Sequence, residues 1–174
     1  MGGGKAVTGA AQDGSRNNGI LLDPAGLLQI LESNRRLTVR VIEAFPEEAL
    51  FGYKPVEILR PFGEMVQEIL NIEDDYVRGI ALGEWYFGKV ADDARTKADL
   101  LTACQQVRAR TRELWPRVTT ERLLQVEPDP FFGGPPQSHF ERLVYALENE
   151  IHHRGQGYVY LRELGIEPPL FYER

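Results

Sequence analysis

Apolar residues recur at intervals of three and four residues in four long segments of the chain, which is the period of an amphipathic α-helix. The first of these segments follows Asp23 and Pro24, an N-cap residue and a proline suited to the first helical position. It ends before the dipeptide Phe45-Pro46, because a residue that precedes proline disfavours the helical conformation. We therefore predict a helix over residues 24–44.

The second and third segments carry their own start and stop signals. The second covers residues 61–82, and Gly83 ends it. The third opens at Thr96, whose hydroxyl group can cap the helix while Asp99 occupies the third helical position. Pro116 interrupts this third helix, because proline has no N–H group to donate.

The fourth segment is the best defined. Ser138 and Glu141 have the spacing of a capping box, and Gly165 is a C-terminal stop, so we predict a helix over residues 138–164. At 100° per residue, one narrow sector of this helix collects its apolar side chains, and we predict that sector as its core face. Its members are Phe140, Leu143, Val144, Leu147, Ile151, Tyr158 and Leu161.

The connection between the third and fourth helices is long and rich in proline and glycine. Over residues 119–137 these residues forbid a long helix, while short strands near residues 123–126 and Phe131 are compatible with the pattern. The fold class that results is all-α, a four-helix bundle with a long third connection. Residues 1–20 are rich in Gly, Ala, Ser and Asn and predict a flexible N-terminal arm, which leaves residues 21–174 as a single domain.

Composition excludes several classes of protein. No apolar run approaches the roughly 20 residues of a membrane span, and no signal peptide is recognisable at the N-terminus. Cys104 is the single cysteine and falls on the apolar stripe of the third helix, so we expect a buried, inert thiol and a cytoplasmic protein.

The distribution of charge argues against binding to nucleic acid. The chain has 26 acidic and 20 basic residues, a net charge of −6, and its arginines alternate with acids and apolar residues. We interpret them as solvated helix faces, and the acidic patch of Glu73, Asp74 and Asp75 as solvated or paired with Arg154 or Arg162. The arginines in question are Arg35, Arg36, Arg40, Arg108, Arg110 and Arg112.

Four further side chains within the fourth helix have simple interpretations. His139 lies in its first turn and is expected at the surface. Glu148 and Glu150 are expected to be exposed or paired with arginines, and Arg154 is expected to connect two helices.

The opposite face of the fourth helix is polar but contains no lysine or arginine. Because a solvated face normally carries charge, we expect this face to border another helix or a cleft. Asn149 and His153 are four residues apart and therefore neighbours on it. Gly155 and Gly157 weaken the helix and are expected to allow close approach of a neighbouring helix or a ligand. The residues of this face are Tyr145, Asn149, His152, His153, Gln156 and Tyr160.

Two stretches, "NEIHHRGQGYVYLRELGIEPP" and "RPFGEMVQEILNIEDDYVRG", resemble the DinB/YfiT-like superfamily of metal-binding four-helix bundles. The resemblance implies a divalent metal, nickel or zinc, held by one histidine of the second helix and two histidines of the fourth helix. In this chain the three positions are Glu68, Asn149 and His153, and His152 occupies a position that is not a ligand in the family.

Two arrangements of these three residues are open. They could hold a metal ion, with a preference for oxygen-loving ions such as Mn²⁺ or Mg²⁺, because Asn149 offers only a neutral carbonyl oxygen. Alternatively, Glu68 and His153 could form a buried hydrogen bond with Asn149 as a third partner.

The resemblance also implies a function. Relatives include metal-dependent transferases that use low-molecular-weight thiols, in which the metal lowers the pKa of the bound thiol. The first hypothesis is such a transferase or a hydrolase, with a divalent metal (Ni, Zn or Mn) and a cleft lined by His152, Gln156 and Tyr160. The second is a non-catalytic, stress-associated bundle with a degenerate metal site that binds another small ligand. A homodimer is expected in either case, because the C-terminal stretch "GYVYLRELGIEPPLFYER" leaves aromatic residues in need of cover.

Overall fold

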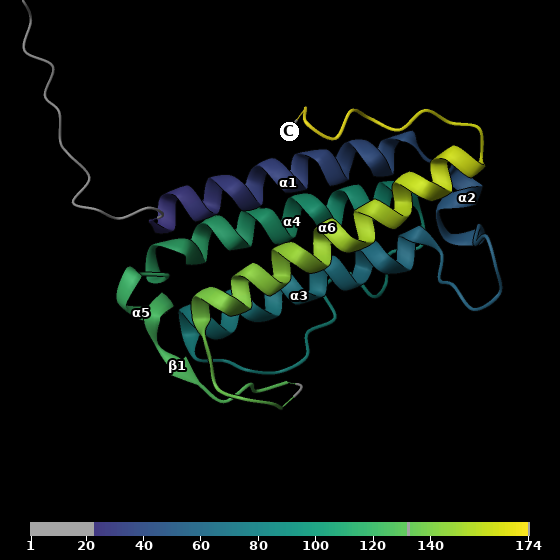
Figure 1. Cartoon of the computed structure of the whole chain (residues 1–174). Coiled ribbons are helices and arrows are strands. Elements are labelled where there is room, and N and C mark those ends of the chain that lie inside the picture. The colour runs from purple at the N-terminus through teal and green to yellow at the C-terminus, as the bar shows by residue number, and fades with distance from the viewer. Residues whose placement is uncertain (1–22, 132, 174) are drawn as a thin grey trace, which may run out of the picture.

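The computed structural model describes residues 23–131 and 133–173 and is a bundle of four long helices (Figure 1). The predicted arm over residues 1–20 lies outside the described residues. Among the residues that are described, no helix has the length and apolar character needed to cross a bilayer. The helices are α1 (Pro24–Ala44), α2 (Glu47–Gly52), α3 (Phe62–Leu82), α4 (Lys97–Leu114), the 3₁₀-helix η1 (Trp115–Arg117), α5 (Thr120–Leu124) and α6 (His139–Glu163).

The all-α class and the four long helices predicted from the periodicity are confirmed. Each predicted end signal also works as expected. Asp23 accepts a hydrogen bond from the Gly26 N–H at the start of α1, and both capping boxes, at Thr96 and Ser138, are formed. Gly83 ends α3 in the left-handed conformation, with φ of 75°.

The order in which the four helices run sets up the cleft described below. His139 at the start of α6 stacks on Trp85 just beyond the end of α3, so α3 and α6 are antiparallel. The Trp115 indole at the end of α4 donates to the Pro24 carbonyl, so α1 and α4 are also antiparallel. Phe45, just after α1, stacks on Phe62 at the start of α3, so α1 and α3 are antiparallel as well. Since α3 and α4 both run opposite to α1, they are parallel, and the connection over residues 83–96 must return along the length of the bundle (Figure 1).

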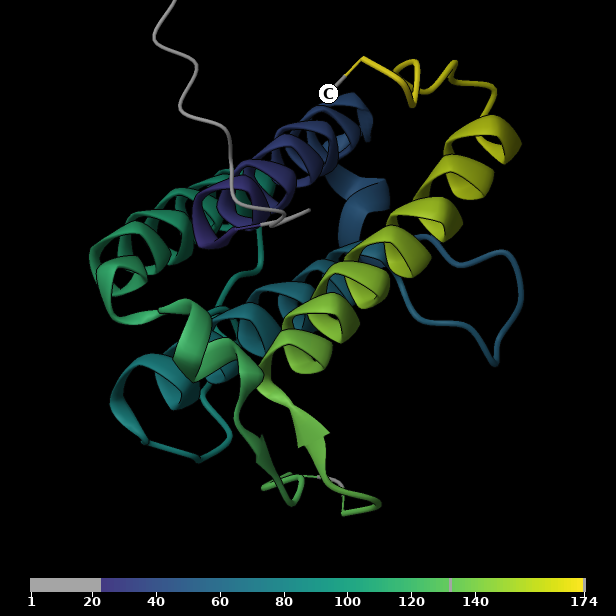
Figure 2. The same cartoon turned by 60° about the vertical axis from the view of Figure 1, so that its left-hand side comes forward.

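The third connection carries more helix than expected and a different strand pair. Residues 120–124 form α5, and the strands are β1 (Val126–Glu127) and β2 (Gln137–Ser138), which pair antiparallel in a hairpin that projects from one end of the bundle (Figure 2). The predicted strand near residues 123–126 is therefore correct only at Val126, and the one at Phe131 is wrong. The pattern failed here because two-residue strands are too short to show a period.

Two apolar clusters fill the two ends of the bundle, and a polar network lies between them. One cluster is built around Phe45, Phe62 and Leu161, and the other around Leu27, Tyr76 and Leu143. The network between them joins all four long helices through ion pairs and hydroxyl contacts. Its members are Asn34, Arg35, Thr38, Glu73, Arg108, Thr111, Glu150 and Arg154.

The interpretation of the acidic patch as solvated is wrong. Glu73, Asp74 and Asp75 are at most 5 % exposed. Glu73 accepts from Arg35 and Arg108, each at 2.9 Å, whereas Arg78 pairs with both aspartates. Charge alone suggested water as the partner, but buried arginines supply the counter-charge, from α1 and α4 to Glu73 and from α3 itself to the two aspartates.

The solvated-face interpretation of the arginines is therefore wrong for Arg35 and Arg108, which are buried, and His139 is buried rather than at the surface. The expectations for Glu150 and Arg154 are confirmed. Glu150 accepts from Arg35 Nε at 3.0 Å, and Arg154 donates to Asn34 of α1, whereas Glu148 is exposed.

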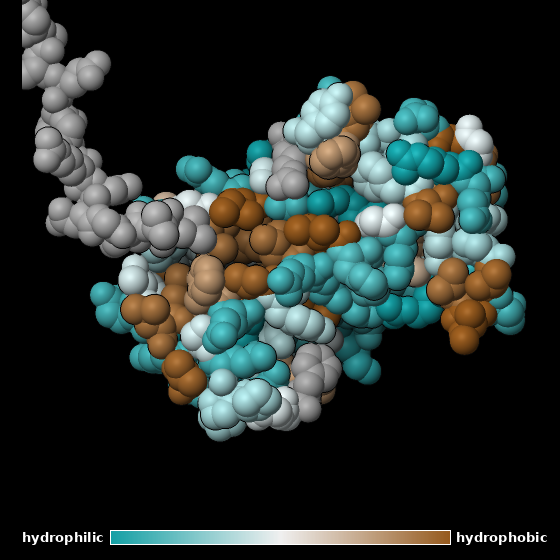
Figure 3. Space-filling view, in the orientation of Figure 1, coloured by the Kyte–Doolittle hydropathy of each residue, from teal (hydrophilic) through white to brown (hydrophobic). Residues whose placement is uncertain are grey.

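The predicted core face of α6 is rotated away from the true one. The buried positions are those of Leu143, Ala146, Glu150, Gly157 and Leu161 among others, which include charged and polar residues that a hydrophobic projection ignores. Of the predicted stripe, Phe140 and Ile151 are exposed, and Val144, Leu147 and Tyr158 are half-buried. Together with half-buried side chains of α1 they leave an apolar strip along α1 and α6 on the surface (Figure 3).

Gly157 and Gly155 make a matched pair that tests the packing of α6. A Cβ atom at Gly157 would lie 2.6–2.9 Å from the Phe62 ring of α3, whereas one at Gly155 would meet nothing within 4 Å. The expectation of a close approach is thus confirmed at Gly157 and wrong at Gly155.

We expect Gly157→Ala to lower the free energy of unfolding by about 1–3 kcal/mol, because the Phe62 ring must shift in a packed core. Gly155→Ala should raise it by about 0.5–1 kcal/mol, since alanine favours the helix at an open site. Urea titrations followed by circular dichroism at 222 nm would measure both. Equal effects of the two substitutions would contradict the close packing of α6 on α3.

Candidate functional site

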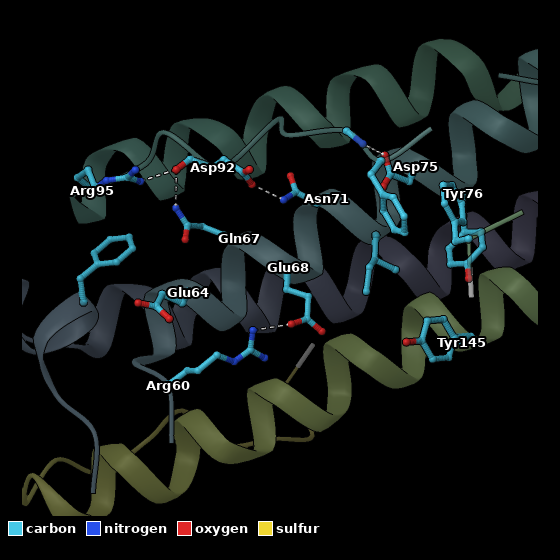
Figure 4. A pocket seen from close by; sticks show the side chains of 15 residues that line it. Arg60, Glu64, Gln67, Glu68, Asn71, Asp75, Tyr76, Asp92, Arg95 and Tyr145 are labelled. Carbon is cyan, nitrogen blue, oxygen red and sulfur yellow. Dashed lines mark hydrogen bonds and ion pairs between the residues drawn. The ribbon is translucent and has the colours of Figure 1, made fainter. Parts of the chain in front are cut away.

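A cleft of about 840 Å³ lies beside α3, and its far wall is the connection over residues 83–96 (Figure 4). This volume is within the range of small-molecule sites in proteins, about 300–1,000 Å³. Side chains of α3 form its floor, and Phe51 and Tyr145 close it from α2 and α6. The lining residues are Phe51, Arg60, Glu64, Gln67, Glu68, Asn71, Ile72, Asp75, Tyr76, Phe87, Gly88, Asp92, Arg95, Phe131 and Tyr145.

Polar side chains spaced one turn apart on α3 hold the returning connection in place. Gln67 donates to the backbone carbonyls of Ala91 and Ala94 at 3.0 and 2.9 Å. Asn71 accepts from the Ala91 N–H, and Asp75 accepts from the Gly88 N–H at 2.8 Å. Because each of these contacts satisfies a backbone group of the connection, the wall of the cleft is a fixed part of the fold.

A cation reinforces the same wall. The Arg78 guanidinium lies 3.6 Å from the centre of the Tyr86 ring and donates to the Tyr86 carbonyl and the Glu84 carbonyl. Burial raises the pKa of Asp74 despite its arginine partners. The aspartates of the acidic patch therefore position the cleft wall through Arg78, a role that their sequence pattern does not reveal.

The two ends of the cleft differ in chemistry. One end is aromatic. The Tyr76 ring lies 5.5 Å from the Phe131 ring and 6.0 Å from the Tyr145 ring, and the Phe87 ring is tilted against Phe131 at 4.8 Å. The other end is charged and contains Arg60, Glu64, Glu68 and Arg95 (Figure 4). An apolar body and a charged group would therefore find different surroundings in the same cleft.

Glu68 lines this cleft and also contacts Asn149 and His153, the other two residues that the sequence singled out. Its Oε1 accepts from Asn149 Nδ2 at 3.0 Å and lies 3.0 Å from His153 Nε2, so the three residues come together. Because an ionised carboxylate only accepts, His153 Nε2 carries the shared hydrogen. The other oxygen, Oε2, pairs with Arg60 at 2.7 Å (Figure 4). Burial alone would raise the pKa of Glu68, but the hydrogen bonds from His153, Arg60 and Asn149 outweigh it and lower that pKa.

These residues do not fit a divalent metal in this arrangement. Asn149 turns its amide nitrogen toward Glu68, and nitrogen of an amide is not a metal donor. The Arg60 guanidinium already neutralises the carboxylate that a metal would need. The arrangement is the hydrogen-bonded alternative of the sequence analysis.

The three residues expected to line the cleft lie elsewhere. His152 is exposed and accepts from Gln156 Nε2 at 3.1 Å, and Gln156 Oε1 lies 3.4 Å from His153 Nδ1. Tyr160 is buried, with its hydroxyl donating to the Arg60 carbonyl at 3.2 Å. None of the three is among the described residues that line the 840 Å³ cleft. They support its charged end from behind, through His153 and the backbone of Arg60.

Comparison with known proteins identifies the family of this chain. The DinB family model matches residues 16–174. The uncharacterised protein YjoA of Bacillus subtilis is 27 % identical over 144 residues, which cover 82 % of this chain and 91 % of YjoA.

Solved structures agree with this sequence match. The crystal structure of YjoA, a DinB-like protein, has a TM-score of 0.69 at 26 % identity and covers 85 % of this chain and 97 % of that one. A DinB-like protein from Bacillus cereus has the same TM-score and coverage at 20 % identity, which shows the fold alone. The match of the family model over most of the sequence shows that this chain belongs to the DinB family.

Proposed function

We propose that this protein binds a small organic ligand in the cleft between α3, α6 and residues 83–96, and that it does so without a metal ion. One observation carries the proposal. The carboxylate at the family's metal position, Glu68, already accepts hydrogen bonds from Asn149, His153 and Arg60, while a cleft of about 840 Å³ lies open beside it.

The chemistry of the lining indicates the class of ligand. Phe87, Phe131, Tyr76 and Tyr145 favour an apolar or aromatic body, since such rings contribute about 0.5–1.5 kcal/mol per pair beyond the burial of surface. At the other end Arg95 has no ion pair with a described residue and favours an anionic group, because guanidinium groups bind such groups through paired hydrogen bonds, whereas Arg60 is already paired with Glu68. The ligand is therefore a small molecule with an aromatic or apolar body and one charged group.

An anilinonaphthalene sulfonate dye has both features and serves as the probe. We expect one molecule to bind per chain and Phe87→Ala to weaken this binding about tenfold, because the substitution removes one aromatic wall of the cleft. Dye fluorescence titrated against protein would give both dissociation constants. Phe171→Ala is the matched control, since Phe171 is 66 % exposed against 62 % for Phe87 but lies in the C-terminal tail, away from the cleft. Equal weakening by both substitutions would contradict binding in this cleft.

The metal-dependent transferase or hydrolase that uses a low-molecular-weight thiol is the second candidate. It is favoured by Asn149 Oδ1, which is buried and has no hydrogen-bond partner among the described residues. Rotation of the amide group would exchange its oxygen and nitrogen, and Arg60 is exposed enough to move away. Glu68, Asn149 and His153 would then be the ligands of a nickel, zinc or manganese ion, and the ion would supply an acidic position for the thiol.

Glu68→Gln distinguishes the two candidates. Without a metal, the wild type should contain less than a tenth of an equivalent of Ni, Zn or Mn by plasma emission spectroscopy, and calorimetric titration with each ion should give no saturable heat. The substitution should then lower the free energy of unfolding by about 1–3 kcal/mol, because hydrogen bonds to a charged acceptor are lost. A stoichiometric metal that Glu68→Gln removes would instead support the enzyme.

Location and assembly complete the proposal. We propose a cytoplasmic protein, supported by the buried free thiol of Cys104, with a role in stress responses suggested by the family resemblance. A homodimer is supported by two exposed apolar regions, the strip along α1 and α6 (Figure 3) and the side chains of Leu170, Phe171 and Tyr172 in the C-terminal tail.

A further inference from the structure

A second, smaller groove of about 290 Å³ lies between α1 and α4, which run side by side (Figure 1, Figure 2). It shares no lining residue with the large cleft. Its walls contain four arginines and one acid, and the single cysteine of the chain lies among them. The lining residues are Glu32, Arg35, Arg36, Val39, Cys104, Gln105, Arg108 and Arg112.

Two of these arginines are buried and only partly satisfied. The Arg35 and Arg108 side chains are 5 % and 7 % exposed. Arg35 uses Nε and Nη2 on Glu150 and Glu73, and Arg108 uses Nη2 on Glu73 and on the Leu31 carbonyl. Within the described part of the chain, no acceptor reaches Arg35 Nη1, Arg108 Nε or Arg108 Nη1. Buried donors of this kind normally have a partner.

The charges around the groove also leave a positive excess. Glu73 and Glu150 lie on the inner side, where Thr111 and Thr38 take further positions on their oxygens at 2.6 Å each. At the rim, Glu32 accepts from Arg112 Nε at 2.5 Å. Arg36 is exposed at the same rim and has no ion pair with a described residue.

We propose that the groove between α1 and α4 is an anion-binding site that takes a phosphate or carboxylate group. Arg35 and Arg108 supply the inner donors, and Arg36 supplies charge at the entrance. Guanidinium groups suit this role because they are always charged and present several N–H donors in one plane. The site is independent of the ligand proposed for the large cleft.

Cys104 makes the site testable, because it lines the groove and no other thiol in the chain can react. Its thiol is buried, and burial raises its pKa to about 11, so alkylation is slow and the rates with and without anion are compared at one alkaline pH. The experiment measures the rate at which iodoacetamide, a neutral reagent, alkylates Cys104 in the full chain. Inorganic phosphate and acetate are titrated separately, and sodium chloride keeps the ionic strength constant. We expect at least one of the two anions to slow alkylation at least threefold and in a saturable way, with the same midpoint in a thermal-shift titration.

Arg36→Gln and Arg117→Gln separate a specific site from general charge effects. Both arginines are exposed, but Arg117 lies on η1 and does not line the groove. Arg36→Gln should raise the midpoint of protection at least threefold, and Arg117→Gln should leave it unchanged. Comparison of the two anions identifies whether a phosphate or a carboxylate is preferred.

Three results would overturn the site. The first is that neither anion protects Cys104, in which case water satisfies the buried guanidinium groups. The second is thermal stabilisation without protection of Cys104, because the anion then binds elsewhere. The third is an equal change in Arg36→Gln and Arg117→Gln, which would show a general effect of surface charge.

Discussion

Glu73→Gln is expected to lower the free energy of unfolding by about 3–5 kcal/mol, the largest effect of any single substitution considered. The Glu73 carboxylate accepts from Arg35 and Arg108 at 2.9 Å and from the Thr111 hydroxyl at 2.6 Å, and it is 4 % exposed. The substitution leaves the buried guanidinium groups of Arg35 and Arg108 without their shared counter-charge. The expected loss of stability is therefore larger than the loss from breaking a solvated ion pair. Urea titration followed by far-UV circular dichroism measures the difference.

Two further variants make this prediction specific. Glu148→Gln removes a carboxylate from the exposed side of α6 and should change the free energy of unfolding by no more than about 0.5 kcal/mol. The double variant Glu73→Gln/Arg108→Gln should lose less than the sum of the two single variants, because each partner is destabilising mainly when the other is left alone. Additive losses would show that the pair is not coupled.

His139 is expected to make stability fall as the solution becomes acidic. The ring is fully buried, stacks on Trp85 at 5.5 Å, and accepts a hydrogen bond from Arg142 at Nδ1 at 2.6 Å. Burial, with the positive charges of Arg122 and Arg142, lowers its pKa from 6.5 to about 4. Between pH 6.5 and about pH 4, His139 is therefore protonated in the unfolded chain but neutral in the folded chain. Stability falls with pH over this range and levels off once the folded ring is also protonated.

The size of this effect follows from the difference in pKa. About 1.4 kcal/mol per pH unit gives a loss of about 3 kcal/mol between pH 6.5 and pH 4. Denaturant titrations between pH 7 and pH 5 isolate the histidine, since most carboxylates titrate lower. His139→Asn keeps an acceptor for Arg142 but cannot be protonated, so its stability should be nearly constant in this range. His152→Asn, at an exposed position of α6, should retain the slope of the wild type, and loss of the slope in that variant would refute the assignment to His139.

The long helices were predictable because their signals are local. The caps at Asp23, Thr96 and Ser138 and the stop at Gly83 act within one turn of the chain, so the sequence around each is sufficient. The convergence of Glu68 with Asn149 and His153 was also expected, because it needed only the family resemblance and the helical period. The core face of α6 was misplaced for a related reason. A helical projection of hydrophobic residues takes no account of Glu150 and Arg154, which are charged. In the structure both are buried, because their hydrogen-bond partners lie on α1.

The wall of the cleft could not be predicted, because the contacts that form it join distant residues. The spacing of Gln67, Asn71 and Asp75 indicates only a polar face of a helix. The pattern of residues 83–96 indicates only a loop. Only the parallel arrangement of α3 and α4 sends that loop back along the bundle, where these three side chains bind its backbone. Hydrogen bonds to a loop depend on geometry that a periodic pattern does not contain.

The sequence by itself determined the helical class, the ends of the four long helices, the family and the meeting of Glu68, Asn149 and His153. Tertiary structure alone decided what surrounds those residues. It placed Arg60 against Glu68, turned the amide nitrogen of Asn149 toward the carboxylate, and moved the expected cleft residues of α6 behind the site. The physical reason is range. Helix signals act within a few residues, whereas the charge on a buried group is set by partners that are 35 to 115 residues away in the chain.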